Sequence, residues 1–358
     1  MLYHIEIFIE EIKVTIYIVV ISILAGLFTF YMGYVDGTSA IASSLATHSL
    51  KPRLALLTCA ISMFVAPLII ILLMGSDTVA RTVGSLIETT AYSSVSPKTG
   101  FIFLISTLAA ALLWAVISII LNVPNSVSHT LLGGLVGAGV IIFGFNSIDW
   151  NSVLIKVVLM VFLAPIVGLL IGYLLQKFFV WMCGAWPRAM KKAFKALQAI
   201  NIVLLSISIA ANNVQKSLGI YLIAMILCSG NSSITFESFE FVWWIVLIFA
   251  FLQCIGLFFG GENLITAVGY KLHKLSTVQS FVAQLATLIV SFAATFIGLP
   301  IATTQVVSSS IMGVGAAEGI RTVSWQKGEK MLISWIVTFP AAMLFGMGIC
   351  ALLKVIVL

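Results

Sequence analysis

Charged residues are scarce in this sequence: they make up 8% of its 358 residues, whereas 61% are hydrophobic. A soluble domain usually carries about a quarter charged residues, so this chain cannot cover its surface with solvated side chains. The net charge of +6 therefore does not indicate a nucleic-acid partner. Cations in the loops of a membrane protein instead set its orientation. The composition predicts a protein whose partner is the lipid bilayer.

Motifs of enzymes, metal sites and disulfide frameworks are also missing. The five cysteines are scattered and form no Cys-x-x-Cys pair, and the four histidines have no metal-ligand spacing. The sequence contains no P-loop, no Gly-x-Ser-x-Gly elbow and no His-Glu-x-x-His motif. We therefore expect neither enzyme activity nor a bound organic cofactor.

Long apolar runs are what the sequence has in abundance. Each run approaches the roughly 20 residues that a helix needs to cross a bilayer. The runs lie at 14–35, 54–75, 100–121, 153–176, 240–259, 280–297 and 331–353. The first has acidic flanks and no cleavage site, so we do not interpret it as a cleaved signal. These runs predict an all-α, multi-pass protein of the cell membrane.

Sequence markers recur at a nearly constant spacing, which indicates an internal duplication. Pro124 and Pro300 lie 176 residues apart, and Trp150 and Trp325 lie 175 apart. Upstream, residues 34–43 align with 211–220 at a spacing of 177. We expect three parts: a first membrane repeat at 1–185, a basic linker at 186–197 and a second membrane repeat at 198–358.

Basic loops alternate between the two halves. Lys51 and Arg53 have no cationic counterpart at 228–230, whereas Lys271 and Lys274 correspond to a cation-poor stretch of the first half. Because loop cations favour the cytoplasmic side, this alternation predicts that the two halves insert with opposite orientation. We place the central basic linker in the cytoplasm.

Each half is expected to contain the same series of membrane elements. The series is a broken crossing (20–50 and 198–228), a plain crossing (54–75 and 240–259), a re-entrant hairpin with its tip at 122–130 or 298–306, and a final crossing (153–176 and 331–353). Proline and hydroxyl residues at the tips interrupt apolar helices. Non-helical backbone at membrane depth is tolerated only where protein buries it or a cavity adjoins it. The sequence therefore predicts two inverted-topology repeats whose breaks meet near the membrane midplane.

Two ionisable residues lie at membrane depth, where each costs about 2.5–3.5 kcal/mol. Among the twelve carboxylates, Asp36 alone sits well inside a spanning segment, and Lys216 is the most deeply placed cation. They occupy near-equivalent places in the two repeats, which favours a shared site. Two alternatives stay open: a lone residue such as Ser39 often only bridges helices, and Asp36 and Lys216 can form a structural ion pair.

The residue types at these positions indicate a compact oxyanion and a coupling cation. Hydroxyls and helix N-termini bind anions, and Asp36 can hold Na⁺ or a proton. The candidate substrate ligands are Ser39, Ser126, Ser128, Asn212, Lys216, Thr303 and Thr304. The candidate coupling-ion residues are Asp36, Asn213, His129 and Gln305, with Asp36 as the candidate Na⁺ ligand. For His129, a neutral imidazole hydrogen-bonded at a helix start is the alternative.

At these positions the sequence resembles the inorganic phosphate transporter family, and the similarity covers both repeats. The family signature, approximately Gly-[Ala/Phe]-Asn-Asp-x-x-Asn-[Ala/Ser], is similar to "GYVDGTSAIAS" and "AANNVQKSLG". The family's tip, Gly-[Leu/Ile]-Pro-[Val/Ile]-Ser-[Ser/Thr]-Thr-His, is similar to "NVPNSVSH" and "GLPIATTQ". The resemblance implies inverted repeats and uptake of phosphate, or of sulfate in related permeases, driven by Na⁺ or H⁺ and often by a homodimer.

The sequence departs from the family signature at charged positions. Where the family signature has an aspartate, an asparagine and a histidine, this sequence has Asn213, Lys216 and Gln305, respectively. In the family signature, the charges of two aspartates would be neutralised by two Na⁺. In this chain the charges of Asp36 and Lys216 already sum to zero. We therefore hypothesise that Lys216 replaces one coupling cation. The lost carboxylate and histidine are natural partners of a phosphate hydroxyl, which leaves sulfate as the alternative substrate. An anion channel and a sensor without transport are further alternatives.

Overall fold

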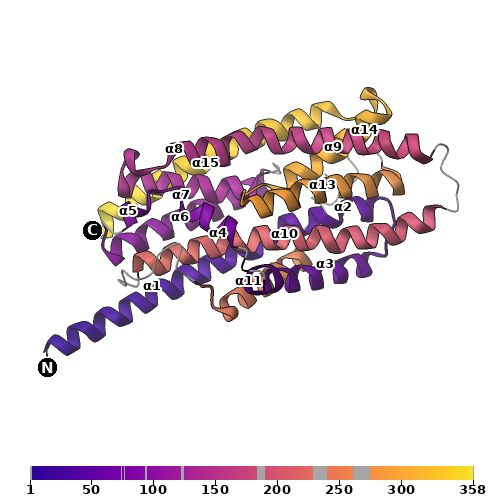
Figure 1. Cartoon of the computed structure of the whole chain (residues 1–358). Helices are drawn as coiled ribbons and strands as arrows, with labels where there is room; N and C mark the ends of the chain where they lie inside the picture. The colour runs from indigo at the N-terminus through magenta and orange to yellow at the C-terminus, as the bar shows by residue number, and fades with distance from the viewer. Residues whose placement is uncertain are drawn as a thin grey trace.

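The structure is a computed structural model that describes residues 2–73, 75, 77–92, 95–121, 125–183, 190–228, 240–260 and 275–357. Helices make up almost all of this part of the chain (Figure 1), and no β-strand occurs in it. Seven of these helices are long and apolar enough to cross a membrane. The predicted all-α, multi-pass class is confirmed.

The first half of the chain begins with one long crossing. α1 (Leu2–Met32) continues through the π-helical turn η1 (Gly33–Gly37) into α2 (Thr38–Ala46). The other elements of this half follow in order: α3 (Pro52–Pro67), η2 (Leu68–Leu73), α4 (Thr78–Gly84), α5 (Thr89–Tyr92), α6 (Pro97–Ile120), α7 (Val127–Phe143), η3 (Phe145–Ser147), α8 (Trp150–Ser152), η4 (Val153–Val158) and α9 (Leu159–Cys183).

The second half presents a similar series of elements. They are α10 (Met190–Cys228), α11 (Trp243–Phe259), α13 (Thr277–Ile297), α14 (Thr303–Glu318), η5 (Ile320–Thr322) and α15 (Trp325–Val357). Equivalent turns share one hydrogen bond: Trp150 Nε1 donates to the Phe145 carbonyl at 2.9 Å, and Trp325 Nε1 donates to the Ile320 carbonyl at 2.7 Å. The same hydrogen bond thus occurs at both of these turns, and the duplication stays a prediction.

The long crossings differ from the prediction at their centres. The break predicted within 198–228 is wrong, because α10 is one uninterrupted α-helix. Its polar side chains find partners on other elements; Gln215, for example, accepts a hydrogen bond from the Val79 amide at 2.8 Å. Within 20–50 the interruption is only the π-turn η1, which keeps the chain helical. The predicted plain crossings fall in α3 and α11, and the final ones in α9 and α15.

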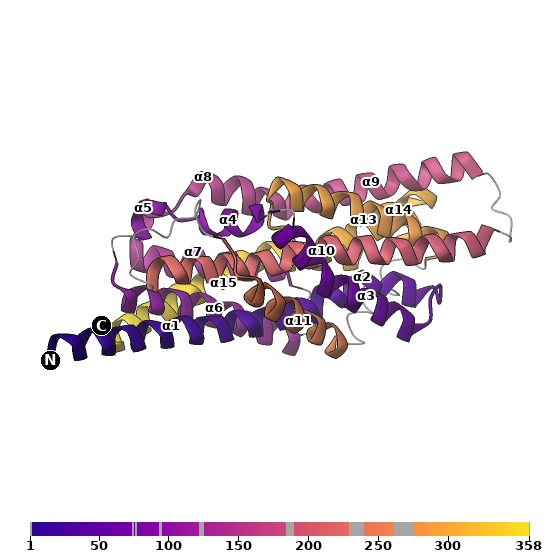
Figure 2. The same cartoon turned by 60° about the horizontal axis from the view of Figure 1, so that its bottom comes forward.

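Two hairpins, α6–α7 and α13–α14, enter the molecule from opposite ends, and their tips lie near its middle (Figures 1 and 2). At the second tip, Gly298 ends α13 with a φ of 80°, a left-handed conformation that favours glycine. Several predicted features lie outside the described residues: Pro124 in the first tip, Lys271 and Lys274. Residues 184–189, which include the start of the predicted linker, also lie outside the described residues. α10 begins at Met190, inside the predicted linker.

The two halves interlock through helices that approach each other closely. α7 packs against α15 of the other half, and α14 packs against α9. A Cβ atom at Gly137 would lie 2.1 Å from the carbonyl oxygen of Met343. In the matching contact, a Cβ atom at Gly313 would lie 2.0 Å from the carbonyl oxygen of Leu169. These contacts fix each hairpin to the final crossing of the opposite half.

Replacing Gly137 or Gly313 by alanine should destabilise the protein by about 1–3 kcal/mol, because the new methyl group overlaps a backbone carbonyl. The measurement is the apparent melting temperature of the purified protein in detergent. Gly348→Ala is the matched control, since a Cβ atom at that position of α15 meets no heavy atom within 4 Å. Equal melting temperatures for all three variants would contradict this packing.

Candidate functional site

Two buried charged residues, Asp36 and Lys216, lie on either side of one amide. Asp36 in η1 is 1% exposed and Lys216 in α10 is 0% exposed. Asn213 Nδ2 donates to Asp36 Oδ2 at 2.8 Å, and Lys216 Nζ donates to Asn213 Oδ1 at 2.8 Å. The described residues contain no direct Asp36–Lys216 salt bridge within 4.0 Å. The predicted proximity of Asp36 and Lys216 is therefore present, but through the Asn213 side chain.

The π-turn at Asp36 is supported by glycine and by hydroxyl side chains. A Cβ atom at Gly33 would lie 1.9 Å from the carbonyl oxygen of Gln253, so only glycine allows α11 to approach this close. The Ser39 hydroxyl donates to the Asp36 carbonyl at 2.8 Å, and the Thr38 hydroxyl donates to the Val35 carbonyl at 2.9 Å. Ser39 thus satisfies the backbone of the turn and does not bind the Asp36 carboxylate.

The two hairpin tips touch each other at Lys216. The Ser128 hydroxyl donates to the carbonyl oxygen of Ile301 at 2.6 Å, and Lys216 Nζ donates to the same oxygen at 3.0 Å. In return, the Thr304 hydroxyl donates to the Asn125 carbonyl at 3.5 Å. The Thr304 backbone also faces the Asp36 carboxylate. Elements predicted to converge from both halves therefore do converge on one buried cluster.

His129 lies at the start of α7, in the arrangement expected for a structural histidine. Its Nδ1 lies 2.5 Å from the Ser126 hydroxyl oxygen, which also accepts from the His129 amide at 3.3 Å. Ser126 therefore caps the helix and orients the imidazole ring. Both residues are fully buried. This geometry agrees with the neutral-histidine alternative.

Several buried polar atoms beside this cluster have no hydrogen-bond partner. They are the Thr303 hydroxyl, both side-chain polar atoms of Gln305, the Asn212 carbonyl oxygen and His129 Nε2. The amide nitrogen of Asn212 is engaged with Leu299 and Thr295. An unpaired buried polar group costs about 1–3 kcal/mol, so the three unpaired atoms at this hairpin tip require a polar partner, which water or a polar ligand can provide.

The start of α14 adds positive electrostatic potential to this place. Ala302, its N-cap residue, supplies no side-chain cap. The first amides of an uncapped helix point outward, and the helix dipole makes its N-terminus electropositive. Thr303 and Thr304 occupy the first turn, near Lys216. Such an arrangement binds anions, and a carboxylate such as Asp36 or a tetrahedral oxyanion fits it.

Two residues that sequence reasoning did not select join this cluster. The Tyr31 hydroxyl donates to Asn125 Oδ1 at 3.1 Å, and Asn125 Nδ2 donates to the Ser118 hydroxyl at 3.1 Å. Asn125 lies within the predicted polar tip, so the sequence could have indicated it as a site residue. Tyr31 lies in an apolar run, and no feature of the sequence there indicates a site residue.

A family model described as the phosphate transporter family matches residues 32–346, which cover most of the chain. The chain belongs to the phosphate transporter family. The resemblance is therefore confirmed, and so is the expectation of a transporter rather than an enzyme.

Relatives of similar length support this membership of the phosphate transporter family. A probable low-affinity inorganic phosphate transporter of Bacillus subtilis (strain 168) is 31% identical over 332 residues, covering 92% of this chain and 94% of the relative. A transporter described in the same words from Rhizobium meliloti (strain 1021) is 32% identical over 320 residues, covering 89% and 91%. A solved structure, "The sodium-dependent phosphate transporter", aligns with a TM-score of 0.76 at 20% identity, covering 95% and 100%. This last likeness shows the fold.

Removing one buried charge of the Asp36–Asn213–Lys216 cluster should destabilise the protein more than removing both. Breaking a buried pair leaves an uncompensated charge and costs about 3–5 kcal/mol. Asp36→Asn and Lys216→Met should each lower the melting temperature in detergent, and the double variant should recover part of the loss. A double variant whose loss equals the sum of the single losses would show that the two charges do not interact.

Proposed function

We propose that the protein is a secondary active transporter of inorganic phosphate that works by alternating access and is coupled to Na⁺ or H⁺. One observation carries this proposal. The uncapped start of α14, with the unpartnered side chains of Thr303 and Gln305, lies beside the buried ammonium group of Lys216. The names of the relatives, which describe inorganic phosphate transporters, agree with it.

The ligands of the phosphate are drawn from both hairpins. Thr303 and Gln305 supply a hydroxyl and an amide that have no other partner. The hydroxyls of Ser128 and Thr304 bond to carbonyl oxygens of the opposite tip, and rotation about χ1 would turn them to a phosphate oxygen. Lys216 and the α14 dipole supply the positive charge. Ser126 and Asn212 hold the tips in place beside these ligands.

Alternating access needs a site that both sides of the membrane can reach in turn. Inverted repeats provide it, because each repeat can rock against the other around a site near the midplane. Figure 1 supports the inversion: α1 and its counterpart α10 run in opposite directions, and so do α9 and α15. We propose that the repeats sit in the cell membrane with the basic linker in the cytoplasm, and that the protein forms a homodimer.

The residues that would bind the coupling cation are those at which this chain departs from the family signature. Lys216 Nζ is held by two oxygens, Asn213 Oδ1 and the Ile301 carbonyl, and such oxygens are also the ligands of hard cations. We propose that the ammonium group takes the place of one Na⁺. Asp36, whose carboxylate accepts a hydrogen bond from Asn213 Nδ2, then carries the remaining coupling ion, Na⁺ or H⁺.

The first test is uptake of labelled phosphate into proteoliposomes under imposed ion gradients. Saturable uptake that follows the gradient is expected, and sulfate should compete weakly. Thr304→Val should raise the KM for phosphate through a loss of about 1–3 kcal/mol of binding. Thr15→Val, on the exposed surface of α1, is the control and should leave the KM unchanged.

Other outcomes of the same assay identify the competing functions. Flux that does not saturate or that ignores the gradient points to a channel. Sulfate uptake that excess phosphate does not block points to a sulfate carrier. Phosphate binding without flux points to a sensor. Each of these outcomes contradicts phosphate symport.

The second test replaces external Na⁺ by choline. Because Lys216 already supplies a fixed positive charge, the wild-type protein should retain phosphate uptake driven by a proton gradient. Lys216→Asn restores the family residue and should make uptake depend on Na⁺. Wild-type uptake that needs as much Na⁺ as uptake by Lys216→Asn would contradict the role given to Lys216, and Na⁺-independent uptake by Lys216→Asn would do the same.

A further inference from the structure

A narrow crevice lies one helical turn beyond Asp36 and is lined by polar side chains. Ser39 and Ser43 of α2 face Gln284 and Thr287 of α13 across it. The crevice is completed by Leu205 of α10, Ala283 of α13, and Val307 and Ile311 of α14. Gln284 Oε1 is buried and has no hydrogen-bond partner. In this closed structure the crevice thus has one unpaired polar atom, Gln284 Oε1, and no charged side chain lines it.

Polar contacts continue from the central cluster along the interface of α10 and α13. The Ser208 hydroxyl bonds to that of Ser291 at 3.0 Å. Farther along, Asn201 Nδ2 donates to the Phe281 carbonyl at 3.0 Å, and Gln198 bonds to Ser280. This direction leads to the end of the molecule where α9 ends and α10 begins (Figures 1 and 2).

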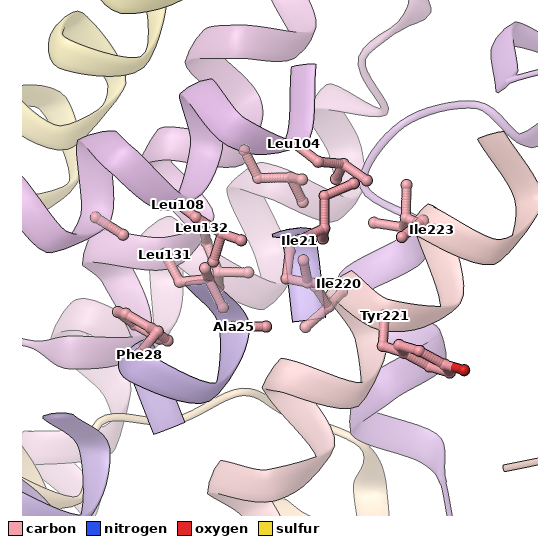
Figure 3. Packing of buried hydrophobic residues seen from close by; sticks show 14 of the residues in the cluster. Ile21, Ala25, Phe28, Leu104, Leu108, Leu131, Leu132, Ile220, Tyr221 and Ile223 are labelled. Atoms are coloured by element: carbon pink, nitrogen blue, oxygen red, sulfur yellow. The ribbon is translucent and has the colours of Figure 1, made fainter. Parts of the chain in front are cut away.

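The equivalent region of the first half is mostly apolar. By the repeat spacing of 176, Gln284 corresponds to Leu108 and Val307 to Leu131; by the spacing of 177, Ser43 corresponds to Ile220 and Leu205 to Phe28. Its polar members are Lys216 of the central cluster, which corresponds to Ser39, and Thr107, which corresponds to Ala283. Phe28, Leu108, Leu131 and Ile220 are all 0% exposed. Figure 3 shows them gathered in one packed cluster with Leu104, which we call the apolar plug.

The crevice and the apolar plug differ in the free energy needed to separate their side chains. Parting the crevice exchanges side-chain hydrogen bonds for bonds to water, a nearly balanced exchange. Parting the apolar plug exposes aliphatic and aromatic surface that water does not compensate. The crevice is thus the side on which the closed structure opens with less free energy.

We propose that the substrate oxyanion moves through this crevice between the central cluster and the linker end of the molecule. The neutral polar groups of Ser43, Gln284 and Thr287 form a weak, transient binding site along this route. This inference rests on the proposed function. A neutral lining suits such a site, because a permeating ion must bind weakly enough to leave.

The test compares one substitution at two repeat-related regions of the full-length protein. Ala283→Cys places a thiol in the crevice, and Ala111→Cys places one beside the apolar plug. Membrane vesicles of both orientations are treated with sulfonatoethyl methanethiosulfonate, an anionic thiol reagent. Modification is read by loss of phosphate uptake and by blocked labelling with a maleimide. The wild-type chain, with its five cysteines, gives the background.

Modification of Ala283→Cys should be several-fold faster than that of Ala111→Cys, should occur from the linker side, and should be slowed by inorganic phosphate. Equal or faster modification of Ala111→Cys overturns the proposal, and so does modification of Ala283→Cys that phosphate does not slow. Leu205→Cys gives a second reading if Ala283→Cys fails to fold. Wild-type uptake is measured separately, so failure of the proposed function is distinguished from failure of the route.

Discussion

The hydrogen-bonded bridge Asp36–Asn213–Lys216 is the interaction on which the centre of this molecule depends. A charge in a low-dielectric interior is costly unless another charge or a set of hydrogen bonds compensates it. Here one amide contacts both charges, with its nitrogen on the carboxylate and its oxygen on the ammonium group. The centre is therefore electrically neutral without an added ion, yet it presents a cation to the tip of α14.

The surrounding helices hold this bridge in place from both halves of the chain. Gly33 lets α11 approach the π-turn that carries Asp36, and Gly137 and Gly313 let each hairpin approach the final crossing of the other half. The backbones approach closely at these glycines, so each hairpin is packed tightly against the final crossing of the opposite half.

The sequence indicated the convergence of the site but not its detailed bonding. The spacing of 177 between the polar segments was enough to expect Asp36 and Lys216 together, since repeats place equivalent positions near one axis. It did not reveal that α10 stays helical, because the partners of its polar side chains, such as the Val79 amide, lie on elements far away in sequence. The Tyr31–Asn125 contact was hidden for the same reason.

The central claim is that both buried charges and both hairpin tips form one phosphate site. The most direct measurement is an experimental density map of the protein with phosphate bound. The account predicts a tetrahedral density within hydrogen-bond distance of Thr303 and Lys216, with Asn213 still in contact with Asp36. Phosphate bound elsewhere, or Asp36 and Lys216 in separate environments, would contradict it.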